Sequence, residues 1–190
     1  MTKLMGSRKW WIGGALLLVL IATRGQHFDS AINLGDATLA VFFLAALLFG
    51  GWKVFPLCLL TTGLVDYSAI QFSGVSDWCV TAGYLMLIPT YAALWGAGLL
   101  ARRSAYSPVG ALQCLLLLSA ATVVAFGISN AGFYLFSGYF DEMAVAEYVG
   151  RVARYLPGYF AYTLLYGGLG LSLSALVATP QAESTVPAGR

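Results

Sequence analysis

The chain has 190 residues, of which 59% are hydrophobic and 9% are charged, and its formal net charge is +2. A soluble domain carries roughly 25% charged residues, so this chain lacks the side chains for an ordinary aqueous surface. Its long apolar runs, without strict alternation, predict an all-α integral membrane protein rather than a barrel. No basic patch with interleaved aromatics indicates a nucleic-acid partner.

The first predicted span covers residues 10–23 and ends at Arg24. Lys3, Arg8 and Lys9 precede it, and Trp10 and Trp11 open it as interfacial anchors. A charged start with a short apolar core also resembles a signal peptide. However, no clear small-x-small cleavage site follows and further spans do, so we interpret this segment as a retained helix.

The next three elements alternate between polar connections and apolar runs. A polar loop over residues 25–36 holds the single histidine, His27. We predict the second span at residues 37–51 and the third at residues 54–72, with Asp66 inside the third towards its far end.

The fourth span is predicted at residues 78–101 and the fifth from residue 108. The uncharged run then continues to residue 140, which is too long for one upright span at ~1.5 Å per residue. We therefore expect residues 130–140 to leave the bilayer, followed by an acidic segment that forms a short amphipathic helix. The sixth span is predicted at residues 155–178.

Six transmembrane helices in a single domain, residues 1–179, place both termini on one side, and residues 180–190 form a polar tail expected to be disordered. The other side carries three basic residues, Arg24, Arg151 and Arg154. Because basic residues favour the cytoplasmic side, both termini are predicted to be cytoplasmic. Seven of the ten basic residues lie on that side: Lys3, Arg8, Lys9, Lys53, Arg102, Arg103 and Arg190.

This topology gathers the polar chemistry on the outer side. An outward-facing pocket, built from the connections after the first, third and fifth spans, explains that distribution. Taken singly, the tyrosines also fit an ordinary interfacial belt. The residues concerned are His27, Asp66, Asp77, Cys79, Tyr84, Asn130, Tyr134, Arg154 and Tyr155.

The three cysteines do not form a metal-finger or disulfide framework, because their number is odd and no CxxC occurs. Cys58 and Cys114 fall inside apolar runs and are expected to be small buried hydrophobes. Cys79 differs, because it stands at the predicted mouth of the fourth span beside Asp77 and Trp78. As a thiolate it would be a ligand for a soft metal, and the helix dipole at that N-terminus is expected to favour the thiolate.

Several activities lack their motifs in this sequence. It contains no Walker A motif and no HExxH or GxSxG sequence, which argues against an ATPase, a zinc protease and a serine lipase. Asp66 is the one acid predicted within a span, fewer than a proton- or sodium-coupled carrier usually shows. We therefore expect Asp66 to support a binding site, and the chain to be a substrate-capturing membrane subunit.

Nearly the whole chain resembles S-components of energy-coupling-factor transporters in its short spans, aromatic outer side and lack of an ATPase motif. A narrower resemblance is to the BtuM family of vitamin B12 transporters. It is carried by Asp66-Tyr67, by Ser76-Asp77-Trp78-Cys79, by Tyr84 and by His27 in the first outer loop.

The resemblance implies uptake of cobalamin, or its precursor cobinamide, across a bacterial inner membrane. It implies the Cys79 thiolate as axial ligand of the corrinoid cobalt, with His27, Asp66 and Tyr84 as further binding residues. A thiolate on one face would weaken the bond to cyanide on the other, so removal of the cyano ligand is a further expectation. Without the resemblance, Cys79 also fits a plain interfacial cysteine and His27 a solvated loop residue.

One departure concerns partners. The first span reads GGALLLVLIA and lacks the AxxxA row expected for docking to a coupling module. Two options stay open: an energy-coupling-factor ATPase module, or no partner. Three other functions also remain: an S-component for thiamine or riboflavin, a ligand-free structural subunit, or an enzyme with Cys79 as nucleophile and His27 as its one available base.

Overall fold

The computed structural model describes residues 2–24, 35–102 and 108–178, and the chain is helical without strands in these ranges. Its elements are α1 (Thr2–Arg24), α2 (Thr38–Leu48), α3 (Val54–Phe72), the 3₁₀ turns η1 (Asp77–Cys79) and η2 (Ala82–Met86), α4 (Leu87–Ala101), α5 (Pro108–Phe136), α6 (Val145–Ala153) and α7 (Leu156–Ala178).

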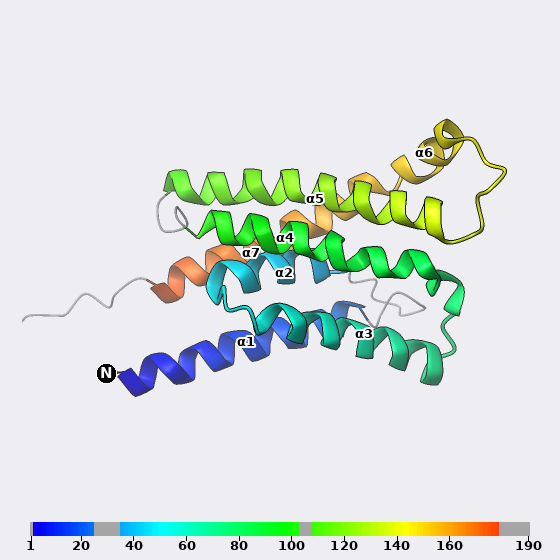
Figure 1. The fold of residues 1–190 in the computed structure, drawn as a ribbon. Helices are drawn as coiled ribbons and strands as arrows, with labels where there is room; N and C mark the ends of the chain where they lie inside the picture. Colours follow the sequence, from blue (N-terminus) through cyan, green and yellow to red (C-terminus); the bar gives the residue numbers. More distant parts are fainter. Residues whose placement is uncertain (1, 25–34, 103–107, 179–190) are drawn as a thin grey trace, which may run out of the picture.

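The long helices run back and forth along one bundle (Figure 1). The start of α1 and the end of α7 lie at the same end of the bundle. The α3–α4 connection and the short helix α6 lie at the other end. The topology thus brings the connections after α3 and α5 to the same end of the bundle. The sequence predicts this arrangement for the outer side.

Helix α2 forms the centre of the bundle. All its residues from Thr38 to Leu47 are buried, and it packs against α1, α3, α4 and α7. A helix that is apolar on every side needs such surroundings. Its 11 residues span only about 16 Å, less than the ~30 Å hydrocarbon core of a bilayer. Because neighbouring helices enclose it, its length is set by protein packing rather than by lipid.

Aromatic rings join α2 to its neighbours. Phe42 of α2 is stacked on Tyr91 of α4, with ring centroids 4.4 Å apart. Phe55 of α3 meets Phe42 edge to face at 5.6 Å and Trp95 of α4 at 5.4 Å. Such pairs contribute about 0.5–1.5 kcal/mol each beyond the area they bury, so these rings fix how α3 and α4 lie around α2.

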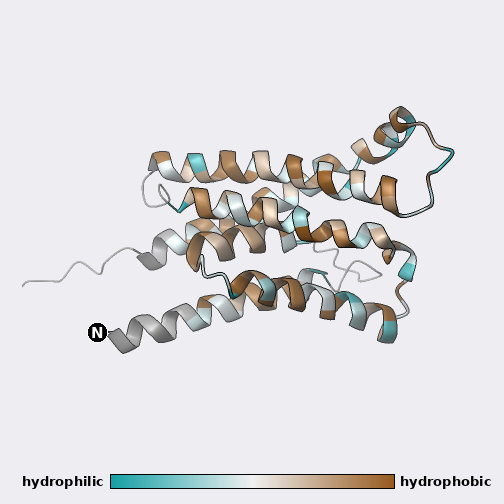
Figure 2. Ribbon diagram, in the orientation of Figure 1, coloured by the Kyte–Doolittle hydropathy of each residue, from teal (hydrophilic) through white to brown (hydrophobic). Residues whose placement is uncertain are grey.

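Among the described residues, three segments are long and apolar enough to cross a membrane: Val54–Phe72, Ala82–Ala101 and Val109–Phe136. Hydrophobic residues predominate along most of the long helices, and hydrophilic residues are more frequent in the connections (Figure 2). On α7, Leu165, Leu169 and Leu173 recur every four residues and are all more than half exposed. An exposed apolar stripe of this kind is suited to contact with lipid.

The predicted element boundaries are confirmed in part. Helix α3 has the predicted bounds, and the short amphipathic helix after the acidic segment is confirmed as α6. The predicted start of the fourth span at residue 78 is wrong, because the membrane-crossing segment begins at Ala82 and the separate turn η1 precedes it. Helix α5 remains continuous as far as Phe136, so most of the segment expected to leave the bilayer is helical. The predicted disordered tail lies outside the described residues.

A close approach of α2 and α4 depends on Gly98. A Cβ atom at this position would lie 2.3 Å from the carbonyl oxygen of Phe43 and 2.8 Å from the Ala46 side chain. The carbonyl belongs to a buried helix and cannot move aside without shifting α2. By contrast, a Cβ at Gly96 on the same helix meets nothing within 4 Å.

We predict that Gly98→Ala destabilises the protein by about 1–3 kcal/mol, because the added methyl group overpacks the α2–α4 interface. Gly96→Ala is the matched control and is expected to be neutral or stabilising by up to about 1 kcal/mol, since alanine favours the helix. Thermal unfolding of the purified protein in detergent would measure both. Equal melting temperatures for the two variants would contradict the close approach.

Candidate functional site

A cavity of about 570 Å³ opens at the end of the bundle that carries the α3–α4 connection. Its volume lies within the range of small-molecule sites. Cys79, Asp66 and Tyr84, three of the four predicted site residues, line it together. The fourth, His27, lies outside the described residues. Asn130 also lines the cavity, whereas Tyr67, Asp77, Tyr134, Arg154 and Tyr155 are not among its lining residues.

The wall that carries Cys79 is the short turn η1. The Ser76 hydroxyl accepts a hydrogen bond from the backbone N–H of Trp78 at 3.2 Å and so starts the turn. The backbone N–H of Val80 donates to the Asp77 carbonyl at 2.7 Å and ends it. Cys79 is therefore the last residue of a capped turn, with an exposed side chain at the cavity.

Aromatic side chains fasten η1 to α5 and to the connection that follows it. Trp78 is stacked on Tyr139 with centroids 4.8 Å apart and meets Phe133 edge to face at 5.1 Å. The Tyr139 hydroxyl also donates a hydrogen bond to the Trp78 carbonyl at 3.2 Å. Since Trp78 and Phe133 both line the cavity, these contacts fix an apolar wall beside Cys79.

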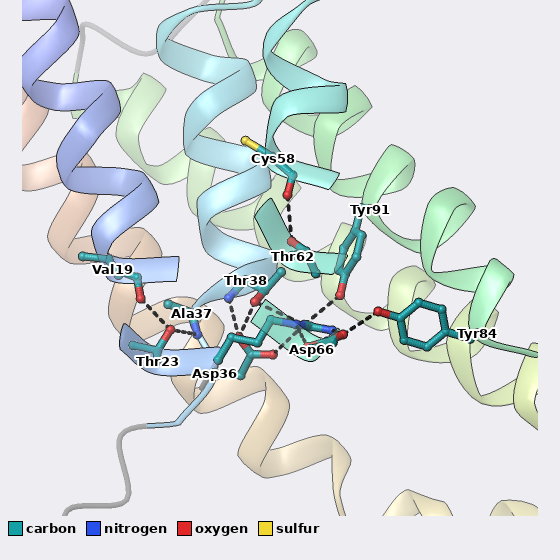
Figure 3. Close-up of polar contacts among 11 residues, drawn as sticks. Val19, Thr23, Asp36, Ala37, Thr38, Cys58, Thr62, Asp66, Tyr84 and Tyr91 are labelled. Carbon is teal, nitrogen blue, oxygen red and sulfur yellow. Dashed lines mark hydrogen bonds and ion pairs between the residues drawn. The ribbon is translucent and has the colours of Figure 1, made fainter. Parts of the chain in front are cut away.

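Arg24, at the end of α1, organises the polar side of the cavity. Its Nε and Nη2 atoms each lie 2.6 Å from a different carboxylate oxygen of Asp66. Its Nη1 atom donates to the Tyr91 hydroxyl at 2.9 Å and lies 3.4 Å from Asp36. Tyr84 completes the cluster, because its hydroxyl donates to Asp66 Oδ2 at 2.5 Å. Figure 3 shows Asp36, Asp66, Tyr84 and Tyr91 converging from separate elements.

The start of α2 is held in the same cluster. Asp36 accepts the backbone N–H of Thr38 at 2.8 Å, which satisfies one of the free N–H groups at this helix end. The Thr23 hydroxyl donates to the Val19 carbonyl and accepts the backbone N–H of Ala37 at 3.1 Å. The C-terminal end of α1 and the N-terminal end of α2 are thereby joined directly (Figure 3).

The ion pair at the cavity is largely shielded from water. The side chains of Arg24 and Asp66 are 10% and 21% exposed. Removing one partner of a buried pair leaves an uncompensated charge and costs about 3–5 kcal/mol. The cluster therefore contributes to the stability of the fold. Its charged groups can also contact a molecule in the cavity, since Arg24 and Asp66 line it.

The protonation of Cys79 differs from the sequence-based expectation. Partial burial raises the pKa of the Cys79 thiol, and the negative charge of Asp66 raises it further. The predicted help from the dipole of the fourth span is wrong, because α4 begins only at Leu87 and the dipole acts within the first turn. The resting site thus favours the thiol over the thiolate.

Sequence reasoning missed several contributors to the site, among them Arg24, Tyr91, Phe133 and Tyr139. It treated Arg24 as the end of a span, although Arg24 is the one basic residue between Lys9 and Lys53 and closes an apolar run. That isolation was the available signal. For Tyr139 no signal existed, because its stacking on Trp78 depends on how α5 and η1 meet in space.

Within the described residues, no group of three or more His, Cys, Asp and Glu side chains could hold a metal ion. The chain matches no protein-family model and no curated protein. Chemically, the cavity offers one soft donor at Cys79, one carboxylate–phenol pair at Asp66 and Tyr84, and an aromatic wall.

We predict that a neutral alkylating reagent such as iodoacetamide modifies Cys79 and spares Cys58 and Cys114, which are 1% and 0% exposed. The pH at half-maximal rate should lie above that of a free cysteine, because the thiol pKa is raised. Asp66→Asn removes a nearby negative charge and should lower this pH midpoint.

Asp77→Asn is the matched control for that change, since Asp77 neighbours Cys79 in sequence but does not line the cavity. Its effect on the midpoint should be smaller than that of Asp66→Asn. Mass spectrometry of each cysteine peptide gives the rates. A midpoint that Asp66→Asn leaves in place would contradict electrostatic contact between the carboxylate and the thiol.

Proposed function

We propose that this chain is a membrane transporter that captures a corrinoid, cobalamin or its precursor cobinamide, with Cys79 as axial ligand of the cobalt. The carrying observation is that Cys79, Asp66 and Tyr84, from three separate elements, line one cavity. The resemblance to the BtuM family implies this set, and its convergence supports the proposal. The alternative of a ligand-free structural subunit has no comparable observation in its favour.

The proposed protein crosses the bacterial inner membrane six times, through α1, α2, α3, α4, α5 and α7. Three segments long enough to span support this arrangement, and the shorter α2 would cross inside the protein. The cavity then opens outwards and both termini are cytoplasmic. The partner is an energy-coupling-factor ATPase module or none, since α1 lacks the expected docking row.

The lining suits part of a corrin ring. A corrin is a broad apolar disc with amide arms, so it needs aromatic walls and a few hydrogen-bonding groups. Trp78 and Phe133 supply the walls, and Asp66, Tyr84 and Asn130 supply polar atoms. A whole corrinoid is larger than the small molecules that such a cavity encloses, so we expect one edge to enter while the rest occupies the mouth.

Cobalt binding would draw Cys79 out of its resting protonation state. The thiol releases its proton to water, its sulfur forms a bond to cobalt, and the water or base on that face of the corrinoid departs. The free energy gained from the bond between sulfur and cobalt offsets the cost of deprotonating the thiol, because thiolates bind soft metal centres strongly. The raised thiol pKa implies that capture strengthens as pH rises.

The same bond would affect the opposite face of the corrinoid. A thiolate donates electron density to cobalt and weakens the bond to an upper cyanide. The cyanide then leaves with its bonding electron pair and takes up a proton, so cobalt keeps its oxidation state. No separate reductant is needed for this substitution.

We predict that Cys79→Ser abolishes the thiolate-specific change in the corrinoid visible spectrum and the release of cyanide from cyanocobalamin. Serine keeps the size but offers a hard, protonated donor. Cys58→Ser and Cys114→Ser are the controls, since both thiols are buried away from the cavity. If Cys79→Ser shows the wild-type spectrum and cyanide release, ligation by Cys79 is refuted and His27 is the next ligand to test.

The topology gives a separate prediction. We predict that the C-terminus is cytoplasmic, because seven of the ten basic residues are assigned to the same side as the termini. A reporter that is active in the cytoplasm should therefore be active when it is fused after Arg190, and a reporter that is active in the periplasm should not. A second fusion, within the connection between α5 and α6, should give the opposite signal. Periplasmic activity after Arg190 would overturn the six-pass arrangement.

A further inference from the structure

The Arg24–Asp66 contact fixes the orientation of a carboxylate as well as its charge. Two nitrogens of one guanidinium, Nε and Nη2, face the two oxygens of Asp66 at 2.6 Å each. A planar fork paired with a planar carboxylate leaves little freedom of rotation. Arg24 is itself held by the Tyr91 hydroxyl at 2.9 Å, so the fork has a fixed support on α4.

This orientation determines what the Tyr84 hydroxyl can do. Its single proton is donated to Asp66 Oδ2 at 2.5 Å. A phenol carries one donor and also accepts hydrogen bonds, so once the proton is engaged the oxygen is left as an acceptor, which the Arg24 guanidinium also faces. Tyr84 lines the cavity together with Cys79, which places this acceptor in the compartment where the thiol lies.

We propose that Arg24 is a positioning residue of the cavity: it turns Asp66 towards Tyr84 and thereby commits the Tyr84 oxygen to accept a hydrogen bond from the ligand. The site then recognises an N–H or O–H donor held close to the atom that Cys79 binds. For a corrinoid, the amide arms carry such N–H groups. The choice of corrinoid rests on the proposed function, whereas the role of Arg24 towards Asp66 and Tyr84 does not.

Arginine and lysine differ at this position. A lysine would supply the same charge as a single point, without the fork that sets the carboxylate's rotation. Arg24→Lys therefore separates orientation from charge compensation. The matched control is Arg151→Lys, because Arg151 pairs with Glu147 at 2.7 Å on the exposed face of α6.

The first test needs no ligand. In protein labelled with ¹³C at the tyrosine Cζ atom, the Tyr84 signal is identified among the 11 tyrosines by its loss in Tyr84→Phe. This signal reports hydrogen bonding of the phenol. We expect Arg24→Lys to move it in the same direction as Asp66→Asn, and Arg151→Lys to leave it in place. An unmoved signal in folded Arg24→Lys overturns the proposal.

If Arg24→Lys does not fold, the double variant Arg24→Gln/Asp66→Asn removes both charges together. Because Arg24 acts mainly through Asp66 and has a smaller direct interaction with Tyr84, adding Arg24→Gln to Asp66→Asn should displace the Tyr84 signal less than Asp66→Asn alone does. A further displacement as large as that of Asp66→Asn would mean that Arg24 acts on Tyr84 mainly by another route, and the proposal fails.

The second test measures binding of cyanocobalamin to the full-length protein. Tyr84→Phe should weaken binding about tenfold, as loss of one hydrogen bond does. Arg24→Lys should weaken binding by a similar factor. The double variant should also lose about tenfold in total, rather than about a hundredfold, because both changes remove the same hydrogen bond. Additive losses would overturn the link between Arg24 and Tyr84. If wild-type protein binds no cyanocobalamin, the proposed function fails, while the tyrosine signal still decides the role of Arg24.

Discussion

The ion pair between Arg24 and Asp66 joins parts of the bundle that pack weakly otherwise. Helix α3 packs mainly against α1 and α2, whereas α4 packs mainly against α2 and α5. Arg24 bridges this division, because it contacts Asp66 on α3 and Tyr91 on α4. Tyr84 crosses the same division from η2 to Asp66. The polar side of the cavity therefore depends on one guanidinium.

The location of this pair follows from the burial of α2. A fully enclosed central helix needs its first N–H groups satisfied within the protein, and Asp36 meets that need beside Arg24. Two carboxylates close to each other require a cation, which Arg24 supplies from the end of α1. Packing at the centre of the bundle and polar chemistry at its end are thus parts of one arrangement.

The sequence predicted the helical class, the bounds of α3 and the gathering of Cys79, Asp66 and Tyr84, because apolar runs and polar breaks record which end of a helix each residue occupies. It did not predict the 3₁₀ turns before α4, since Val80 and its neighbours continue the apolar run. Nor did it predict the pairing of Arg24 with Asp66, which are 42 positions apart. Such a contact depends on the relative rotation of α1 and α3, and periodicity does not encode it.

The electrostatics of the cavity disfavour the reactive, deprotonated form of the exposed Cys79 thiol. A low thiol pKa would leave an exposed thiolate open to oxidation and alkylation. Here burial and the Asp66 charge hold Cys79 in its protonated form. A partner that binds sulfur strongly, such as a soft metal centre, would displace the proton, and a rise in pH would also remove it. Asp66 thus has two effects in the structure: it accepts the proton of the Tyr84 hydroxyl, and its charge keeps the neighbouring thiol protonated.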